Sequence, residues 1–205
     1  MEKLADTKYP IHELLRQRWS PRAFADRMVE PEKIRSLLEA ARWAASSFNE
    51  QPWSFIVATK AHEEEYERLL SCLVEGNIKW AKHAPVLMLS VAKLTFDRSG
   101  KPNRHAFHDV GLAVENLVIQ ATALGLSVHQ MAGFHVEKAR EVFAIPDGQE
   151  PVAMIVLGYP GDPGGLPDDL RERELAPRSR KALRDFVFAG RWGHALPLVT
   201  EEATE

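Results

Sequence analysis

The stretch HAFHDVGLAVENLVIQATALGL, residues 105–126, decides how the rest of the chain can fold. Its apolar residues point in nearly all directions around a helix, and one narrow polar stripe interrupts them at helical spacing. That stripe consists of His105, Asp109, Asn116 and Gln120. A helix of this kind has to be surrounded by protein, yet it is too polar to span a membrane. It is either the core helix of one domain or a core helix shared with a second subunit, and we favour the second.

The composition is that of an ordinary water-soluble chain. It has 205 residues, of which 45% are hydrophobic and 27% charged, and this predicts a single domain over residues 1–205. The net charge of -3 gives no general attraction to nucleic acids or acidic membranes, so we expect neither as a partner. The lone Cys72 offers no disulfide framework and no metal-ligand spacing. Because the first ten residues lack an apolar run, we expect no secretory signal and a cytoplasmic protein.

A cluster of arginines follows the first expected helix. In the sequence RQRWSPRAF, Arg16, Arg18 and Arg22 surround Ser20, and Pro21 forces the backbone to turn where the helix must stop. Guanidinium groups bind phosphate through paired hydrogen bonds, so the turn could hold an anion. Arginines on a surface turn are more often a solvated charge cluster, and the residues by themselves leave both interpretations open.

A second polar segment, AASSFNEQPWSF, spans residues 44–55. It contains Ser46, Ser47, Asn49 and Gln51. Such side chains usually cap helices and turn the chain. They also supply the short donors and acceptors that suit a neutral heterocyclic or hydroxyl-rich ligand.

Apolar periodicity and turn residues predict an alternation of helices and strands. The expected helices cover residues 11–18, 31–41, 63–74, 105–126 and 136–143, with Ile11, Leu14 and Leu15 buried in the first of them, and a turn is expected at Gly76 and Asn77. The expected strands cover residues 55–59, 86–91, 127–132 and 153–157. Four strands among about five helices indicate an α+β domain in which helices cover a sheet.

The C-terminal part has a different composition. Residues 159–169, YPGDPGGLPDD, are rich in glycine and proline, so we expect no regular structure there. A second basic cluster, PRSRK, and an apolar tail with Phe186, Phe188 and Trp192 follow. Leaving these aromatic side chains in water would cost roughly 25 cal/mol per Å² of apolar surface, so the tail is expected to dock on a partner subunit.

In order and spacing, these residues resemble the FMN-dependent nitroreductase family over nearly the whole chain. The motifs are R-x-S-x-R (residues 18–22), S-S-x-N-x-Q-P-W (46–53), D-x-G-x-A-x-x-N-L (109–117), G-L (125–126) with A-G-F (132–134), and R-x-R-K (178–181). The resemblance implies an α+β, nitroreductase-like fold with a central, mostly antiparallel sheet flanked by helices. It also implies a domain-swapped homodimer that exchanges a C-terminal arm, residues 182–205, and has two FMN sites built from both chains.

The resemblance implies a role for each site residue. Arg18, Ser20, Arg178 and Arg180 would hold the ribityl phosphate, and Arg22 and Asn77 would approach the pyrimidine edge of the flavin. Ser46, Ser47 and Asn49 would come from the partner chain, and a backbone N–H at Ala132 or Gly133 would face flavin N5. Trp19, Gln51 and Met131 complete the expected cofactor site.

Two positions depart from the family pattern. Ala132 stands where some relatives have an acidic residue, and Trp80 stands where others have a lysine that contacts the flavin. Both changes would lower the polarity near the flavin ring.

The implied function is an FMN-dependent oxidoreductase that takes hydride from NADH or NADPH and passes it through flavin N5 to a second, small-molecule acceptor. The acceptors would be nitroaromatics or quinones, with an enone or a halogenated aromatic as alternatives. Because the cofactor does the chemistry, no catalytic side chain or metal is expected, and the eight histidines are interpreted as packing or surface residues. Two other hypotheses are a flavin- or nucleotide-binding module without turnover and a phosphate-ester hydrolase, although the latter has no metal-ligand grouping or adjacent base.

Overall fold

The computed structural model describes residues 2–200 and divides the chain into two compact units. The first unit extends to Leu175 and the second begins at Ala176. The first unit contains the sheet and every long helix, so it is described first.

A four-stranded sheet forms the centre of the first unit, with the strand order β1-β2-β4-β3 among the described residues. Its strands are β1 (Trp53–Thr59), β2 (Val86–Lys93), β3 (Ser127–Met131) and β4 (Gln149–Gly158). All three neighbouring pairs are antiparallel. The predicted α+β class with a mostly antiparallel sheet is therefore confirmed.

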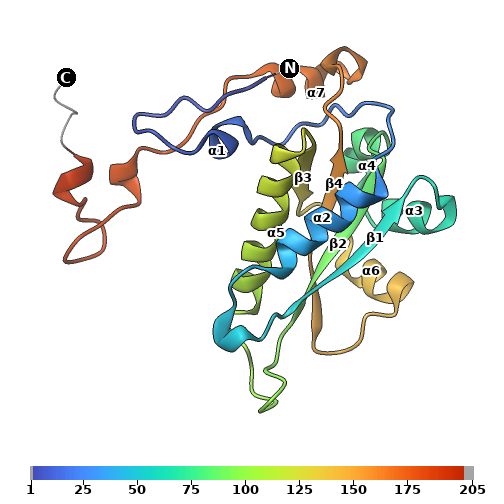
Figure 1. The fold of residues 1–205 in the computed structure, drawn as a ribbon, viewed down its shortest axis with the longest axis horizontal. Helices are drawn as coiled ribbons and strands as arrows, with labels where there is room; N and C mark the ends of the chain where they lie inside the picture. Colours follow the sequence, from blue (N-terminus) through green and yellow to red (C-terminus); the bar gives the residue numbers. More distant parts are fainter. Residues whose placement is uncertain (1, 201–205) are drawn as a thin grey trace. The chain divides into compact units, whose positions relative to one another are not determined.

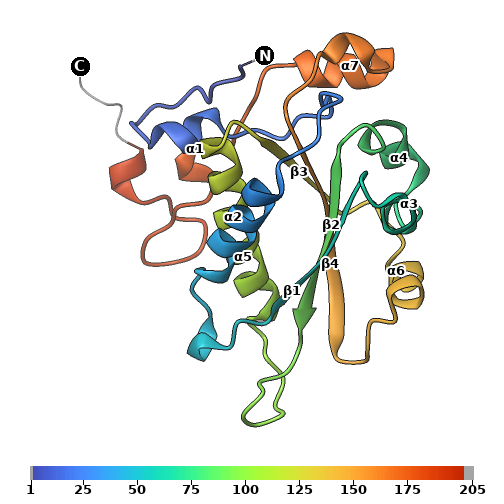
Figure 2. The same cartoon turned by 45° about the vertical axis from the view of Figure 1, so that its right-hand side comes forward.

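Helices cover both faces of this sheet. Along β2, Val86 and Met88 belong to the core on one face, whereas Leu87 and Leu89 belong to the core on the other. One face carries α2 (Pro31–Arg42) and α5 (Ala106–Ala123), and the other carries α3 (Glu63–Leu70), α4 (Glu75–Ala81) and α6 (Val136–Phe143) (Figure 2). Since both faces are covered, β2 is buried over nearly its whole length.

The predicted central helix is α5, and this unit covers only part of its surface. Its polar stripe is turned partly toward α2, where the Asn116 side chain donates to the Ala40 carbonyl (3.1 Å) and Gln120 donates to Ser36 Oγ (3.0 Å). On another side, Phe107 and Leu112 remain 50% and 38% exposed. The expectation that protein surrounds the helix is therefore not met within one chain.

The helix expected over residues 63–74 is wrong at its C-terminal end. The chain leaves α3 before Val74, whose backbone N–H donates to the Gly133 carbonyl (3.2 Å), and α4 then begins at Glu75. The turn expected at Gly76 and Asn77 is accordingly absent from the described chain, because these residues lie inside α4. Burial of Trp80 on that helix outweighs the turn preference of glycine and asparagine.

Two expectations near the ends of this unit are also wrong. The helix α1 (Glu13–Gln17) has no buried face, since Ile11 is 43% and Leu15 is 45% exposed. The reason is that this five-residue helix lies at the surface beside α5. The glycine- and proline-rich stretch does not stay irregular either, because α7 (Asp168–Leu175) begins within it with two aspartates at its positive N-terminal end (Figure 1).

The second unit is described here up to Thr200. Its backbone folds back on itself, so that the Leu196 N–H donates to the Val187 carbonyl (3.0 Å) and the rings of Phe188 and Trp192 lie 5.1 Å apart. Trp192 is still 90% exposed. Two short 3-10 turns, Leu183–Asp185 and Pro197–Val199, flank this hairpin.

Candidate functional site

The first group of predicted site residues, 18–22, forms a loop at the C-terminal end of α5, called the arginine loop below. The Arg18 guanidinium donates to Ser20 Oγ (3.2 Å), and the Lys3 ammonium lies 5.0 Å from the ring centre of Trp19. Arg18 and Trp19 line a cavity of about 190 Å³ together with Gly125 and Ser127, the residues that join α5 to β3. The loop thus offers a cation and a hydroxyl group beside a small cavity.

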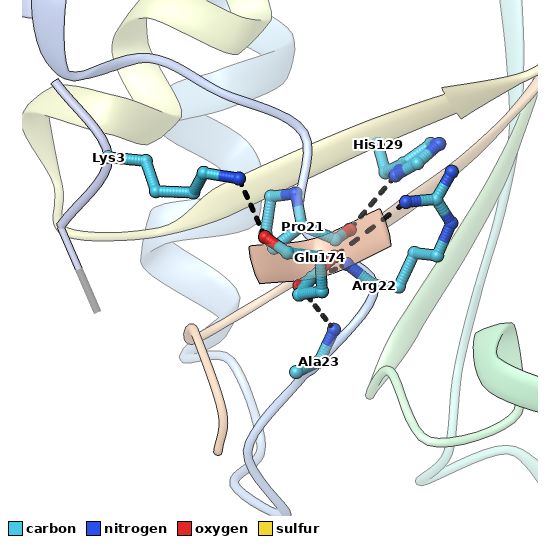
Figure 3. A network of polar contacts seen from close by, with 6 residues as sticks. All are labelled: Lys3, Pro21, Arg22, Ala23, His129 and Glu174. Carbon is cyan, nitrogen blue, oxygen red and sulfur yellow. Dashed lines mark hydrogen bonds and ion pairs between the residues drawn. The ribbon is translucent and has the colours of Figure 1, made fainter. Parts of the chain in front are cut away.

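Two side chains from different elements, the partly buried His129 and the buried Glu174, hold this loop (Figure 3). On one side, His129 of β3 lies with Nδ1 2.9 Å from the Pro21 carbonyl oxygen. On the other side, Glu174 of α7 accepts the backbone N–H groups of Arg22 (2.8 Å) and Ala23 (3.1 Å) on Oε1. The backbone of the loop is therefore fixed by tertiary contacts and not only by its proline.

The protonation state of His129 follows from its surroundings. Burial lowers the pKa of His129 to about 4, because the charged ring would lose its hydration; the hydrogen bond to Pro21 opposes this shift and the nearby Arg22 charge adds to it. The ring is therefore neutral at pH 7. Since a carbonyl oxygen can only accept, the proton must be on Nδ1.

The second group of predicted residues lies after β3. The Asn77 side chain donates to the Gly133 carbonyl (3.0 Å), and a Cβ on Gly133 would come within 2.6 Å of Asn77 Nδ2. Met131 is buried, while Ala132 is exposed. Within residues 2–200, the backbone N–H groups of Ala132 and Gly133 donate to no protein acceptor. The prediction that Asn77 and Gly133 share one site is consistent with this contact, and the two amides are available as donors.

The third group is the polar segment of residues 44–55, called the serine-rich segment below, and its backbone is strained. Phe48, Asn49 and Gln51 all have positive φ angles (54°, 57° and 51°), a conformation that residues other than glycine adopt at an energetic cost. The segment is stabilised by the Gln51 N–H, which donates to Ser46 Oγ (3.0 Å), and by the Ser47 N–H, which donates to Asp109 Oδ2 (2.9 Å). Such retained strain is typical of functional sites.

The serine-rich segment and the arginine loop lie at opposite ends of α5 in one chain. The serine-rich segment is bonded to Asp109 in the first turn of α5, whereas the arginine loop lines a cavity with Gly125, just after its end. Fourteen residues of α5 lie between Asp109 and the end of the helix at Ala123, which corresponds to roughly 21 Å. Figure 1 shows the same separation, with η1 (Ser47–Asn49) and the α5–β3 connection at opposite ends of the helix. One chain therefore does not bring Arg18 and Ser47 into one site.

The remaining predicted residues differ in outcome. Arg178 and Arg180 belong to the second unit, and their role stays a prediction. Trp80 does not face a ligand, because it is 1% exposed and packs between Phe24 (6.5 Å between ring centres) and His129 (4.7 Å). Its large apolar ring is buried in the core beside His129, and the expectation that it lowers polarity near the flavin stays a prediction.

Glu174 was not predicted from the sequence. It is a residue of α7, is 1% exposed and holds the arginine loop. One sequence signal could have identified it, because Leu170 and Glu174 stand four residues apart and share the buried side of α7. The glycines and prolines before α7 concealed that helix. His129 was placed correctly as a packing residue, but its contact with the arginine loop was not anticipated.

No group of three or more His, Cys, Asp or Glu side chains within residues 2–200 is arranged to hold a metal ion. None of the helices in that range is both long enough and apolar enough to cross a membrane.

Comparison with known proteins gives the family. The family model named Nitroreductase family matches residues 15–159, more than half of the chain. A putative NADH dehydrogenase/NAD(P)H nitroreductase of Methanothermobacter thermautotrophicus is 30% identical over 166 residues, covering 79% of this chain and 83% of the relative. An uncharacterized 15.4 kDa protein of Mycolicibacterium smegmatis is 38% identical over 136 residues, covering 66% and 90%. A solved structure described as an oxidoreductase containing FMN superposes with a TM-score of 0.86 at 38% identity, covering 91% and 95%. The chain therefore belongs to the nitroreductase family of oxidoreductases.

Proposed function

We propose that this chain is an FMN-dependent oxidoreductase that uses NADH or NADPH to reduce nitroaromatic, quinone or related electron-poor acceptors, working as a cytoplasmic homodimer. The observation that carries the proposal is the pair of available backbone N–H groups at Ala132 and Gly133, beside Asn77. A flavin ring presents acceptors along one edge and at N5, so donors fixed on a rigid strand end suit it. The FMN-containing oxidoreductase with a similar fold supports the choice of cofactor.

The chemistry of the donor set fits FMN. Arg18 and Ser20 offer a cation and a hydroxyl group for a phosphate, and Arg22 and Asn77 offer donors for the pyrimidine edge of the flavin. When bound, FMN supplies the hydride acceptor and donor at N5, so the protein needs no nucleophile. The work of this chain is to orient the ring, to place positive charge where the reduced flavin is negative, and to exclude water from the ring face.

The open sides of α5 support a homodimer. Because Phe107 and Leu112 are exposed on this otherwise apolar helix, a second copy packed against it would bury them. A twofold axis that pairs the two α5 helices in antiparallel fashion would bring the serine-rich segment of one chain to the arginine loop of the other. The exposed Trp192 supports an arm, residues 182–205, that wraps the partner chain; residues 201–205 of this arm lie outside the described residues.

The experiment is to purify the protein, remove FMN and titrate it back while following the flavin spectrum. We expect a yellow protein with tight, noncovalent FMN, and rapid loss of the yellow colour when NADH or NADPH is added without oxygen. A protein that does not take up FMN would overturn the proposal. Uptake of FMN without reduction by either nicotinamide would instead favour a binding module without turnover.

A charge variant tests the phosphate assignment. Arg18→Ala should weaken FMN binding by tenfold or more, because a charge-assisted hydrogen bond contributes roughly 1.5 to 3 kcal/mol. The matched control is Arg35→Ala on α2, which removes an arginine from an exposed pair with Glu32. Equal FMN affinity in both variants would return Arg18 to the solvated charge cluster that its sequence also allowed.

A further inference from the structure

The carboxylate of Glu174 is buried against the arginine loop from a helix at the far end of the first unit's sequence. It is 1% exposed on α7, 152 positions from Arg22 in sequence. Its Oε1 accepts two backbone N–H groups, those of Arg22 and Ala23, and its own carbonyl accepts the Lys3 ammonium (2.6 Å) (Figure 3). One residue of α7 thus fixes two N-terminal segments.

A carboxylate at this position is not required by packing alone. Its neighbour on the same side of α7, Leu170, is an apolar residue buried in the core. Burying a carboxylate costs free energy unless its oxygens are paired, and here the second oxygen, Oε2, has no hydrogen-bond partner among the described residues. The Arg22 guanidinium lies within ion-pair distance, with its Nη1 3.7 Å from Oε2. The buried Glu174 carboxylate is therefore explained by its ion pair with Arg22 and by its hydrogen bonds to the backbone of the arginine loop.

Arg22 has charged and polar neighbours on two sides. Glu174 lies on one side, and the neutral ring of His129 lies on the other (Figure 3). Its side chain keeps 26% exposure, so the guanidinium is held in place and still reachable from outside. A carboxylate at this distance offsets part of the arginine charge, because charges attract strongly where water is largely excluded.

We propose that Glu174 is a positioning residue, which fixes Arg22 in the cofactor site and sets how much positive charge Arg22 presents to the flavin. This inference rests on the FMN function proposed above. Positive charge near the pyrimidine edge stabilises the reduced, anionic flavin over the oxidised flavin. Glu174 therefore holds the reduction potential of bound FMN lower than Arg22 alone would set it.

The deciding variant is Glu174→Gln in the FMN-loaded protein. The glutamine oxygen can still accept the N–H groups of Arg22 and Ala23, so the loop is kept while the negative charge is removed. We expect the affinity for reduced FMN to rise relative to oxidised FMN by roughly threefold to tenfold. A tenfold change corresponds to a shift of about 30 mV to more positive potential for a two-electron couple. Glu172→Gln, which removes an exposed carboxylate from the same helix, is the control and should leave the potential unchanged.

A second background shows whether the effect passes through Arg22. In an Arg22→Gln protein, Glu174→Gln should shift the potential less than it does when Arg22 is present, because only the direct effect of the Glu174 charge on the flavin then remains. Glu174→Ala should lower the unfolding temperature of the FMN-free protein as well, since it leaves two buried N–H groups without an acceptor.

The outcomes separate this inference from the function on which it rests. If the wild-type protein fails to bind FMN, the proposed function is wrong and this inference falls with it. If FMN binds and Glu174→Gln has the same potential as Glu172→Gln, or a more negative one, the inference alone is overturned and Glu174 is only structural. A shift of the same size in the Arg22→Gln background would overturn the role of Arg22 as the intermediary.

Discussion

At each end of α5, a buried carboxylate holds the backbone of a polar loop. At each end a carboxylate that is at most 2% exposed accepts backbone N–H groups from a polar loop: Asp109 binds the Ser47 amide, and Glu174 binds those of Arg22 and Ala23. Buried carboxylates are costly, so their use at both ends indicates that loop geometry is maintained at the expense of stability.

The difference lies in what each loop carries. The serine-rich segment has no cation of its own and adopts three left-handed backbone conformations, so Asp109 compensates for strain. The arginine loop contains Arg22, so Glu174 modulates charge in addition to holding the backbone. A carboxylate of the same burial can thus stabilise a conformation at one end and adjust an electrostatic field at the other.

The largest expected effect concerns whether the two ends meet across a dimer. Arg18→Ala and Asp109→Ala should each impair both sites of a homodimer. A heterodimer of the two variants, purified with two different tags, would have one site with both changes and one site with neither. We expect it to bind one FMN at wild-type affinity, measured by flavin titration.

The control is a heterodimer of Arg18→Ala and Arg22→Ala, which alters the same loop in both chains and should restore no site. If the first heterodimer also restores none, the two ends of α5 do not combine across subunits.

A smaller effect is expected from His129, which supports the arginine loop. The folded-state pKa of His129 is about 4 against an ordinary 6.5, so the folded protein binds this proton less tightly than the unfolded chain does. Its contribution is complete above about pH 6.5 and is lost as the pH falls toward 4, by up to about 3 kcal/mol. The measurement is the free energy of unfolding against pH, for the wild type and for His129→Gln.

Glutamine can still donate to the Pro21 carbonyl but does not titrate, so the difference between the two curves isolates this ring. The exposed His83, whose pKa is also lowered, mainly by partial desolvation, is present in both proteins, so its contribution cancels. Parallel curves between pH 6.5 and 4 would contradict the assignment of a neutral His129 with a lowered pKa.

The sequence predicted the helices and strands that are determined by local patterns of apolar residues. Val136–Phe143 has a strong apolar period, and its predicted bounds agree with α6. The start of α4 was missed because a hydrogen bond from Val74 to Gly133, distant in sequence, interrupts the helical pattern. Likewise, the motif residues could be identified by their spacing, but the acid that holds Arg22 comes from Glu174, which no local pattern connects to that loop. Candidate site residues could thus be proposed one segment at a time, whereas the groups that support them could not be predicted.

Removing the acid at the other end of α5 should have a moderate effect. Asp109→Ala leaves the Ser47 N–H without its acceptor and should cost about 2 kcal/mol of unfolding free energy, since hydrogen bonds to charged groups contribute roughly 1.5 to 3 kcal/mol. FMN affinity should fall about tenfold because the strained segment relaxes. Thermal unfolding and flavin titration measure the two losses.

Asp109→Asn retains an acceptor oxygen and should recover most of both quantities. Glu115→Ala, on the exposed side of α5, is the matched control. Loss of stability with unchanged FMN affinity would show that the strained segment is not part of the cofactor site.

The smallest effect on stability and FMN affinity is expected at the contact between Asn77 and Gly133. This contact lies just after β3 and involves neither Asp109 nor Glu174. A methyl group in Gly133→Ala would come within 2.6 Å of Asn77 Nδ2 and 3.1 Å of Val74 Cγ2, so the asparagine side chain has to move. Overpacking of this kind costs about 1 kcal/mol, and FMN binding should weaken a few fold. Asn77→Ala removes the closer of the two contacts, so the double variant should lose less than the sum of the single variants. Strictly additive losses, measured by denaturant unfolding of the four proteins, would mean that Asn77 is not what requires glycine at position 133.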